Sequence, residues 1–143
     1  MKLLTKQPTT AGPAELFTGN VYFDVIARGE GESRMRVNTV RFSPCARTAW
    51  HSHSRGQSLH VTDGIGVVAT RDRVIIMRPG DTVHTLPGEE HWHGALPDHF
   101  MTHLAMWEDD DATWGDHVTD QEYAAATDAA DGYADRSAAT VGE

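Results

Sequence analysis

Residues 45–64 read CARTAWHSHSRGQSLHVTDG and carry the strongest indication of the fold. His51 and His53 are two residues apart, so on a β-strand their imidazoles point to the same face. Gln57 follows just beyond Gly56, where the next strand is expected to begin. Its amide oxygen can therefore reach the same point in space as the two imidazoles, which is the arrangement of a metal site.

A fourth candidate ligand, His91, follows the turn at Pro87-Gly88. Two hairpins fold back between the histidine pair and His91, so the four side chains can converge inside a barrel. Three neutral imidazoles and one amide oxygen suit a borderline divalent metal such as manganese, iron, cobalt, nickel or zinc. We therefore predict one divalent transition metal per chain, with four ligands: His51, His53, Gln57 and His91.

The surrounding sequence has the period of short β-strands. Over residues 36–42, Asn38, Val40 and Phe42 share one face, and the residues between them share the other. Turn signals such as Asp63-Gly64 and Pro79-Gly80 separate further short runs. The runs expected to be strands are 57–61, 65–70, 73–77, 82–86 and 100–107. Many short strands at regular spacing predict an all-β sandwich or barrel.

The two ends of the chain differ from this centre. Residues 1–20 contain two prolines and two glycines, and we expect an extended arm or short edge strands there. The barrel is expected over residues 21–118. The run Thr119-Asp120-Gln121-Glu122 is a capping box, and the alanines from Ala124 to Ala130 favour a helix after it. Residues 119–143 are therefore predicted to form a short helix and, from about Gly132, a flexible tail.

Size and charge restrict the function classes. The chain has 143 residues, about one domain, and a net charge of −9. An acidic chain is repelled by phosphate backbones and anionic lipid, so we expect a small-molecule substrate and neither nucleic acid nor a membrane as partner. The lone Cys45 allows no intramolecular disulfide. With no signal-like or membrane-spanning apolar run, a cytoplasmic protein is expected.

Two segments resemble the two motifs of the cupins. Residues 45–64 keep the histidine, ligand and final glycine spacings of G-x5-H-x-H-x3-E-x6-G, with Cys45 in place of the opening glycine and Gln57 in place of the glutamate. Residues 80–91 keep the glycine and histidine spacings of the second motif, although its proline is one place late. The resemblance implies a single-domain cupin, a double-stranded β-helix or jelly-roll barrel.

A narrower resemblance covers most of residues 12–123. The runs 46–51, 91–94, 101–105 and 117–120 look like those of the small bacterial manganese cupins that include hydroxynitrile lyases. This resemblance implies manganese, with glutamine as the fourth ligand, and a homodimer or homotetramer. It also implies a catalytic histidine at His103 and a cavity-lining strand that carries Asn38, Val40 and Phe42. The chain departs from the group at Trp107, where glutamine is usual, and at Asn38, where a smaller residue is common.

Four neutral ligands would leave a divalent ion its full formal charge, which strengthens it as a Lewis acid. The same ligands suit high oxidation states less well, which favours lyase or isomerase chemistry over an oxygenase. His103 could then take the hydroxyl proton of a substrate, because the pKa of an unperturbed imidazole lies near neutral pH. His93 shares a face with His91 and is expected to line the cavity or to support the metal, and Trp107 to narrow the pocket.

Three functions therefore stay open. The first is a metal-dependent lyase that cleaves a C–C bond in a small hydroxyl- or carbonyl-bearing substrate, as hydroxynitrile lyases do. The second is a dioxygenase that uses iron and O₂ on a small aromatic or dicarbonyl substrate. The third is a binding protein for a small ligand, without catalysis. Oxygen consumption during turnover distinguishes the second from the first.

Overall fold

The computed structural model describes residues 1–109 and 111–128. Within them the chain is built almost entirely of antiparallel β-strands, with one helix over residues 120–128. The strands are β1 (Thr10–Ala11), β2 (Phe17–Thr18), β3 (Val21–Arg28), β4 (Met35–Phe42), β5 (Arg47–Thr48), β6 (His51–His53), β7 (Gln57–Gly64), β8 (Gly66–Ala69), β9 (Val74–Met77), β10 (Thr82–Thr85), β11 (Trp92–Ala95), β12 (Met101–Glu108) and β13 (Ala112–Trp114).

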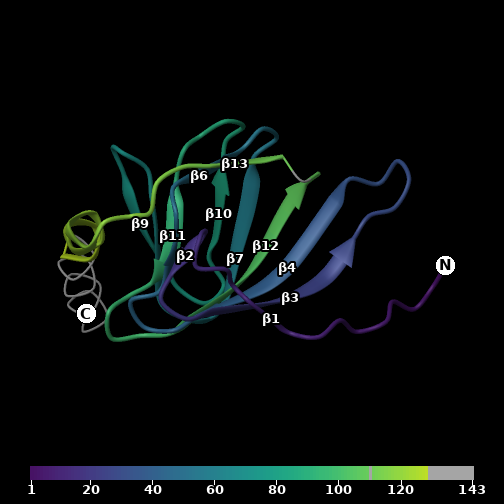
Figure 1. Cartoon of the computed structure of the whole chain (residues 1–143), viewed down its shortest axis with the longest axis horizontal. Coiled ribbons are helices and arrows are strands. Elements are labelled where there is room, and N and C mark those ends of the chain that lie inside the picture. Colours follow the sequence, from purple (N-terminus) through teal and green to yellow (C-terminus); the bar gives the residue numbers. More distant parts are fainter. Residues whose placement is uncertain (110, 129–143) are drawn as a thin grey trace, which may run out of the picture.

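Two sheets face each other in the barrel (Figure 1). The larger has six strands in the order β1-β3-β4-β12-β7-β10, and the smaller has five in the order β2-β5-β11-β8-β9. Strands β6 and β13 form a separate pair across one end of the barrel. Neighbours in each sheet are often far apart in sequence, as in a jelly roll. The all-β barrel with a short C-terminal helix is thus confirmed.

Alternation along the strands builds the core between the two sheets. In β7, Leu59 and Val61 are fully buried while His60 between them is half-buried on the outer face. Phe42 of the larger sheet and Met77 of the smaller belong to the same apolar cluster. Val40 and Phe42, predicted to share one face of the strand over residues 36–42, are both buried in this packing.

The helix covers the outer face of the five-stranded sheet (Figure 1). Tyr123 packs there against Trp92, with ring centroids 5.9 Å apart, and its hydroxyl donates to the carbonyl of Ala95 at 2.6 Å. The predicted capping box is present: Glu122 N donates to Thr119 Oγ1, and Thr119 N donates to Glu122 Oε1, both at 3.0 Å. The predicted alanines at 129–130 and the predicted tail from 132 lie outside the described residues.

The N-terminal arm forms the short edge strands expected of it, with β1 beside β3 and β2 beside β5. Strand β3 itself was not predicted. Its alternation of Val21, Phe23 and Val25 is interrupted by an irregularity between Val25 and Ala27, where the register with β4 shifts. Within the described residues, no helix has the length and apolar character needed to cross a bilayer.

Two turns explain positions of the first cupin-like motif. Gly64 has φ +75°, and a Cβ there would collide with the carbonyl oxygen of Phe100, so only glycine fits. Cys45, which replaces the motif's opening glycine, has φ +70°. The backbone therefore keeps the left-handed conformation although the residue has a side chain, which costs about 1–2 kcal/mol.

Candidate metal centre

Two strands and one loop bring the predicted ligands to one place. His51 and His53 both lie on β6 and are buried, and Gln57 begins β7. His91 lies just before β11 and forms a bridge with His51, in which each backbone N–H donates to the other residue's carbonyl at 2.9 Å. This reciprocal pair holds the two imidazoles with their ring centroids 4.4 Å apart.

Backbone carbonyls set the orientation of two of these rings. Nδ1 of His51 lies 2.9 Å from the carbonyl oxygen of Ala49, and Nδ1 of His91 lies 2.8 Å from that of Glu89. A ring nitrogen that faces a carbonyl oxygen must carry the hydrogen, so Nε2 of each neutral ring presents a lone pair. This is the tautomer that a metal ligand needs.

Gln57 provides the test of whether a metal fits. Its Oε1 lies 3.2 Å from Nε2 of His91. With Nδ1 of His91 donating to Glu89, both of these atoms are acceptors, and two acceptors at this distance repel unless a cation lies between them. Two ligands at right angles around a metal, each at about 2.1 Å, are about 3 Å apart. The pair therefore fits two ligands of one ion.

His53 lies farther from this pair, with its ring centroid 5.3 Å from that of His51 and 6.1 Å from that of His91. Neither of its ring nitrogens has a hydrogen-bond partner among the described residues. Nδ1 lies 3.5 Å from Oδ1 of Asp111, a carboxylate held by Ser54 and the backbone N–H of Arg55. Ligating histidines usually have such a carboxylate or carbonyl behind them, so His53 also has the surroundings of a ligand.

His93 adds a further donor that the sequence had assigned to the substrate cavity. One ring nitrogen from each of His51, His91 and His93 lies within 4.8 Å of the others, so these three residues could hold a metal ion. Nε2 of His93 is buried and has no hydrogen-bond partner among the described residues. The structure therefore offers two possible donor sets that share His51 and His91. One adds His53 and Gln57, and the other adds His93.

His103 lies on the side of His93 that faces away from the cavity. It is completely buried, and its Nε2 is 3.0 Å from Nδ1 of His93. It is not among the residues that line the cavity. Phe42 does not line the cavity either, because its ring packs against His93 and His103, with centroids 5.8 Å and 5.3 Å away. The other predicted substrate-binding residues, Asn38, Val40, His93 and Trp107, do line it.

Burial keeps all five imidazoles neutral. It lowers the pKa of His51 to about 3 and that of His103 to about 4. It also lowers the pKa values of His53, where Asp111 opposes the shift, and of His91 and His93. At neutral pH each ring therefore has one lone pair free to bind a metal or accept a hydrogen bond.

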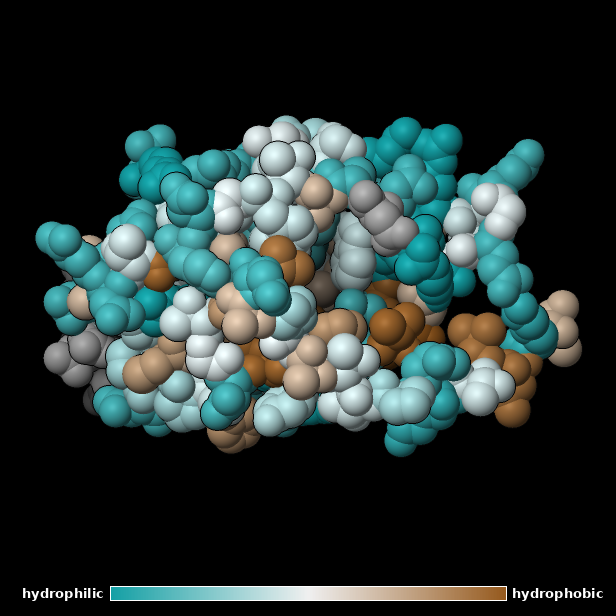
Figure 2. Space-filling model, viewed as in Figure 1, coloured by the Kyte–Doolittle hydropathy of each residue, from teal (hydrophilic) through white to brown (hydrophobic). Residues whose placement is uncertain are grey.

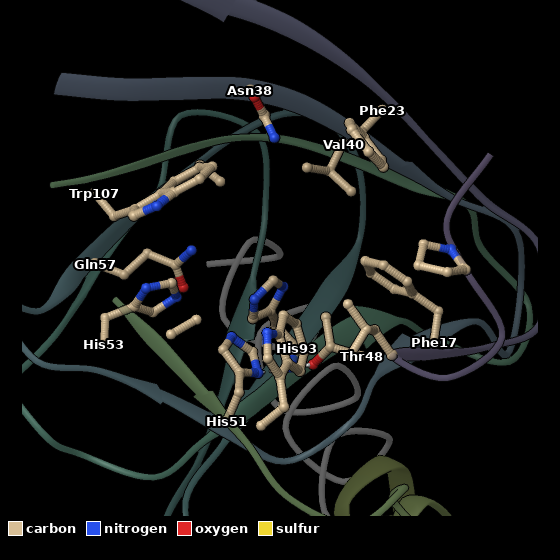
Figure 3. A pocket seen from close by; sticks show the side chains of 15 residues that line it. Phe17, Phe23, Asn38, Val40, Thr48, His51, His53, Gln57, His93 and Trp107 are labelled. Carbon is tan, nitrogen blue, oxygen red and sulfur yellow. Dashed lines mark hydrogen bonds between the residues drawn. The ribbon is translucent and has the colours of Figure 1, made fainter. Parts of the chain in front are cut away.

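The cluster forms one wall of a cavity of about 370 Å³ (Figure 3). Figure 2 shows apolar side chains, in brown, gathered in the middle of the face of the molecule seen there, among mostly hydrophilic ones. None of the described residues that line the cavity is acidic, lysine or arginine. The lining residues are Pro13, Leu16, Phe17, Phe23, Asn38, Val40, Thr48, His51, His53, Gln57, His93, Ala105, Trp107, Ala112 and Trp114.

Several of these residues were not predicted. Phe17 comes from the N-terminal arm, and Trp114 lies on β13, opposite His51 in the register, with the two rings stacked at 4.5 Å. The alternation of a three-residue strand is too short to assign a face, so the sequence carried no usable signal for Trp114.

Comparisons with known proteins identify the family of the chain. A family model described as a cupin domain matches residues 38–104. The chain is 42% identical over 127 residues to an (R)-mandelonitrile lyase of Granulicella tundricola, a match that covers 86% of this chain and 97% of that protein. The chain is a cupin. The predicted family and fold are thereby confirmed.

Solved structures show the same cupin barrel. The structure of a cupin-like protein of Thermotoga maritima has a TM-score of 0.80 and 36% identity, covering 89% of this cupin and 98% of that chain. The polyketide cyclase RemF of Streptomyces resistomycificus, at 19% identity, has a TM-score of 0.65 and shares the fold alone, over 87% of this chain and 91% of that one.

Proposed function

We propose that this cupin is a metal-dependent lyase that cleaves the C–C bond next to a hydroxyl group in a small neutral substrate, as in cyanohydrin cleavage. The observation that carries the proposal is the 42% identity to an (R)-mandelonitrile lyase across 97% of that relative. A cluster of neutral imidazoles beside an uncharged cavity supports it. The cavity is large enough for a small aromatic molecule.

We propose His51, His53, Gln57 and His91 as the residues that hold the metal, with manganese the first candidate and iron, zinc, nickel or cobalt compatible with the same donors. The orientation of Nε2 in His51 and His91, and the Gln57–His91 contact, support this set. When bound, the metal would supply Lewis acidity toward a hydroxyl or carbonyl oxygen of the substrate.

His93 and His103 would then move the proton. His93 presents Nε2 to the cavity, and its Nδ1 contacts Nε2 of His103 at 3.0 Å. If Nδ1 of His93 donates this hydrogen bond, its Nε2 can accept the hydroxyl proton while His103 takes part of the positive charge. The C–C bond electrons leave with the nitrile carbon, which takes up the proton as the carbonyl product forms. His103, predicted as the base, acts in this scheme through His93.

The experiment combines a rate with a metal measurement. The purified chain, loaded with manganese, is assayed for benzaldehyde release from mandelonitrile, and manganese affinity is titrated separately. His103→Ala should lower the rate about 10²- to 10⁴-fold and leave the affinity unchanged. His60→Ala is the matched control, since His60 lies on the outer face of β7 and bonds Thr82 at 2.8 Å.

The affinities also distinguish the two donor sets. His51→Ala and His91→Ala should lose the metal in either case. Loss in His53→Ala but not in His93→Ala supports the proposed set, and the reverse supports the other. A parent no faster than free manganese would contradict the lyase, and oxygen uptake during turnover would instead indicate a dioxygenase.

A further inference from the structure

Asn38 presents a polar group to the cavity wall opposite the histidine cluster. In Figure 3 its amide nitrogen points into the cavity, and His51 and His93 lie on the far side. Its neighbours across the sheet are Val25 on β3 and Ala105 on β12, whose side chains carry no polar atom. Among the described residues the Asn38 side chain forms no hydrogen bond.

We propose that Asn38 is a specificity residue that donates a hydrogen bond to a second, neutral acceptor on the substrate, at the end remote from the histidine cluster. The inference rests on the proposed function, in which the substrate's reacting oxygen lies at that cluster. When a ligand displaces water from the cavity, an amide without a partner is left unsatisfied, and this penalises a purely apolar ligand. A carbonyl, ether or hydroxyl oxygen on the ligand removes the penalty.

The register sets the length of such a ligand. Gln57 on β7 pairs with Trp107 on β12, and Trp107 pairs with Arg36 on β4, two residues from Asn38. Two strand spacings across and two residues along separate the Cα atoms of Gln57 and Asn38 by no more than about 12 Å. Both side chains rise from the same sheet into the cavity of about 370 Å³, and a ligand of one aromatic ring with its substituents matches this span.

The side walls and the charge fix the chemical class. Trp107 lies on one side of the path between Asn38 and the histidines, and Val40 and Phe23 lie on the other (Figure 3). These walls favour a flat apolar body. Because the cavity lining contains no acidic, lysine or arginine side chain among the described residues, a charged group on the ligand would have no partner there. The inferred class is therefore a neutral single-ring compound with two oxygen groups at opposite ends.

The test compares two probes of similar size, 4-acetylbenzyl alcohol and 4-isopropylbenzyl alcohol, together with their 3-substituted isomers. Binding to the manganese-loaded chain is measured by calorimetry, without turnover. One neutral hydrogen bond should favour the acetyl probe about fivefold in at least one isomer pair. Asn38→Leu, which removes the amide at similar volume, should abolish this preference while still binding the isopropyl probe. Asn20→Leu, outside the cavity, is the matched control and should keep it.

Equal binding of acetyl and isopropyl probes to the parent in both isomer pairs would overturn the inference, as would a preference that survives in Asn38→Leu. The outcome is separate from that of the lyase assay. A parent without cyanohydrin activity that still shows the Asn38-dependent preference supports the role of Asn38 and contradicts the proposed reaction. Cyanohydrin activity without the preference contradicts only the role of Asn38.

Discussion

Replacement of Asp111 by asparagine tests whether His53 is a ligand through the carboxylate behind it. Oδ1 of Asp111 lies 3.5 Å from Nδ1 of His53 and has no hydrogen-bond partner among the described residues. Burial opposes ionisation of this carboxyl, but hydrogen bonds from Ser54 and from the Arg55 backbone outweigh it, so the pKa of Asp111 is lowered. An ionised carboxylate at this position favours a ring that carries its hydrogen on Nδ1 and presents Nε2 to the metal.

The expected magnitude follows from this geometry. Loss of a group that supports a ligating histidine costs about 10- to 100-fold in metal affinity, or about 1.4 to 2.7 kcal/mol. Because the distance is longer than a hydrogen bond and the asparagine oxygen can still accept, Asp111→Asn should lie near the lower end, at about tenfold. Asp111→Ala, which leaves nothing behind the ring, should approach the upper end.

The assay is a competitive titration of manganese against a chelator, at neutral pH. Ser54→Ala is the control, because it removes a hydrogen bond to Oδ2 of Asp111 and leaves Oδ1 facing His53, so affinity should change less than about threefold. If His53→Ala loses the metal but Asp111→Ala binds manganese as tightly as the parent, Asp111 does not support His53 as a ligand. If His53→Ala also binds normally, His53 is not a ligand, and the set His51, His91 and His93 is favoured.

Three further perturbations have directions set by the structure. Cys45→Gly should raise the free energy of unfolding in urea by about 0.5–1 kcal/mol, because it relieves a positive φ, whereas Cys45→Ala should not. Gly64→Ala should lower the free energy of unfolding by about 3 kcal/mol or more. Gly80→Ala is the control and should lower it by about 1 kcal/mol, because φ is +91° there but an added Cβ meets no other atom. Equal losses in the two variants would contradict the clash at Gly64. The folded pKa values of His51 and His103 lie below the unfolded value of about 6.5, so the unfolded state binds more protons as pH falls. Between pH 6.5 and 5 the free energy of unfolding of the metal-free protein should fall by about 1.6 kcal/mol for each residue. Denaturant titrations that show no such fall would contradict their burial.

Most of the fold follows from local patterns in the sequence. Alternation at Leu59 and Val61 identifies β7, and the capping box at Thr119 identifies the start of the helix, because each depends only on neighbouring residues. Strand β3 was missed where its register shifts after Val25. The pairing of β6 with β13 was also missed, since it joins segments about sixty residues apart that carry no common pattern.

In the histidine cluster, too, local patterns predicted some features and missed others. Residues 100–107 were predicted to form a strand, and Met101, His103 and Ala105 share one buried face of β12. Alternation could not show that His93 would stand between His103 and the cavity, because the two residues belong to different sheets. Their separation depends on how the sheets pack, and no short-range pattern encodes it.

The electrostatics of the site connect the metal set with the kind of substrate. Burial keeps the five imidazoles neutral, and the described residues that line the cavity carry no acidic, lysine or arginine side chain. A divalent ion among neutral donors would keep its full charge, whereas the Asn38 end of the cavity offers only a neutral hydrogen bond. Such a site favours a substrate that enters uncharged and develops negative charge only at the histidine end. Deprotonation of a hydroxyl group before a C–C bond breaks has this charge pattern, which an electron-transfer reaction with oxygen does not require.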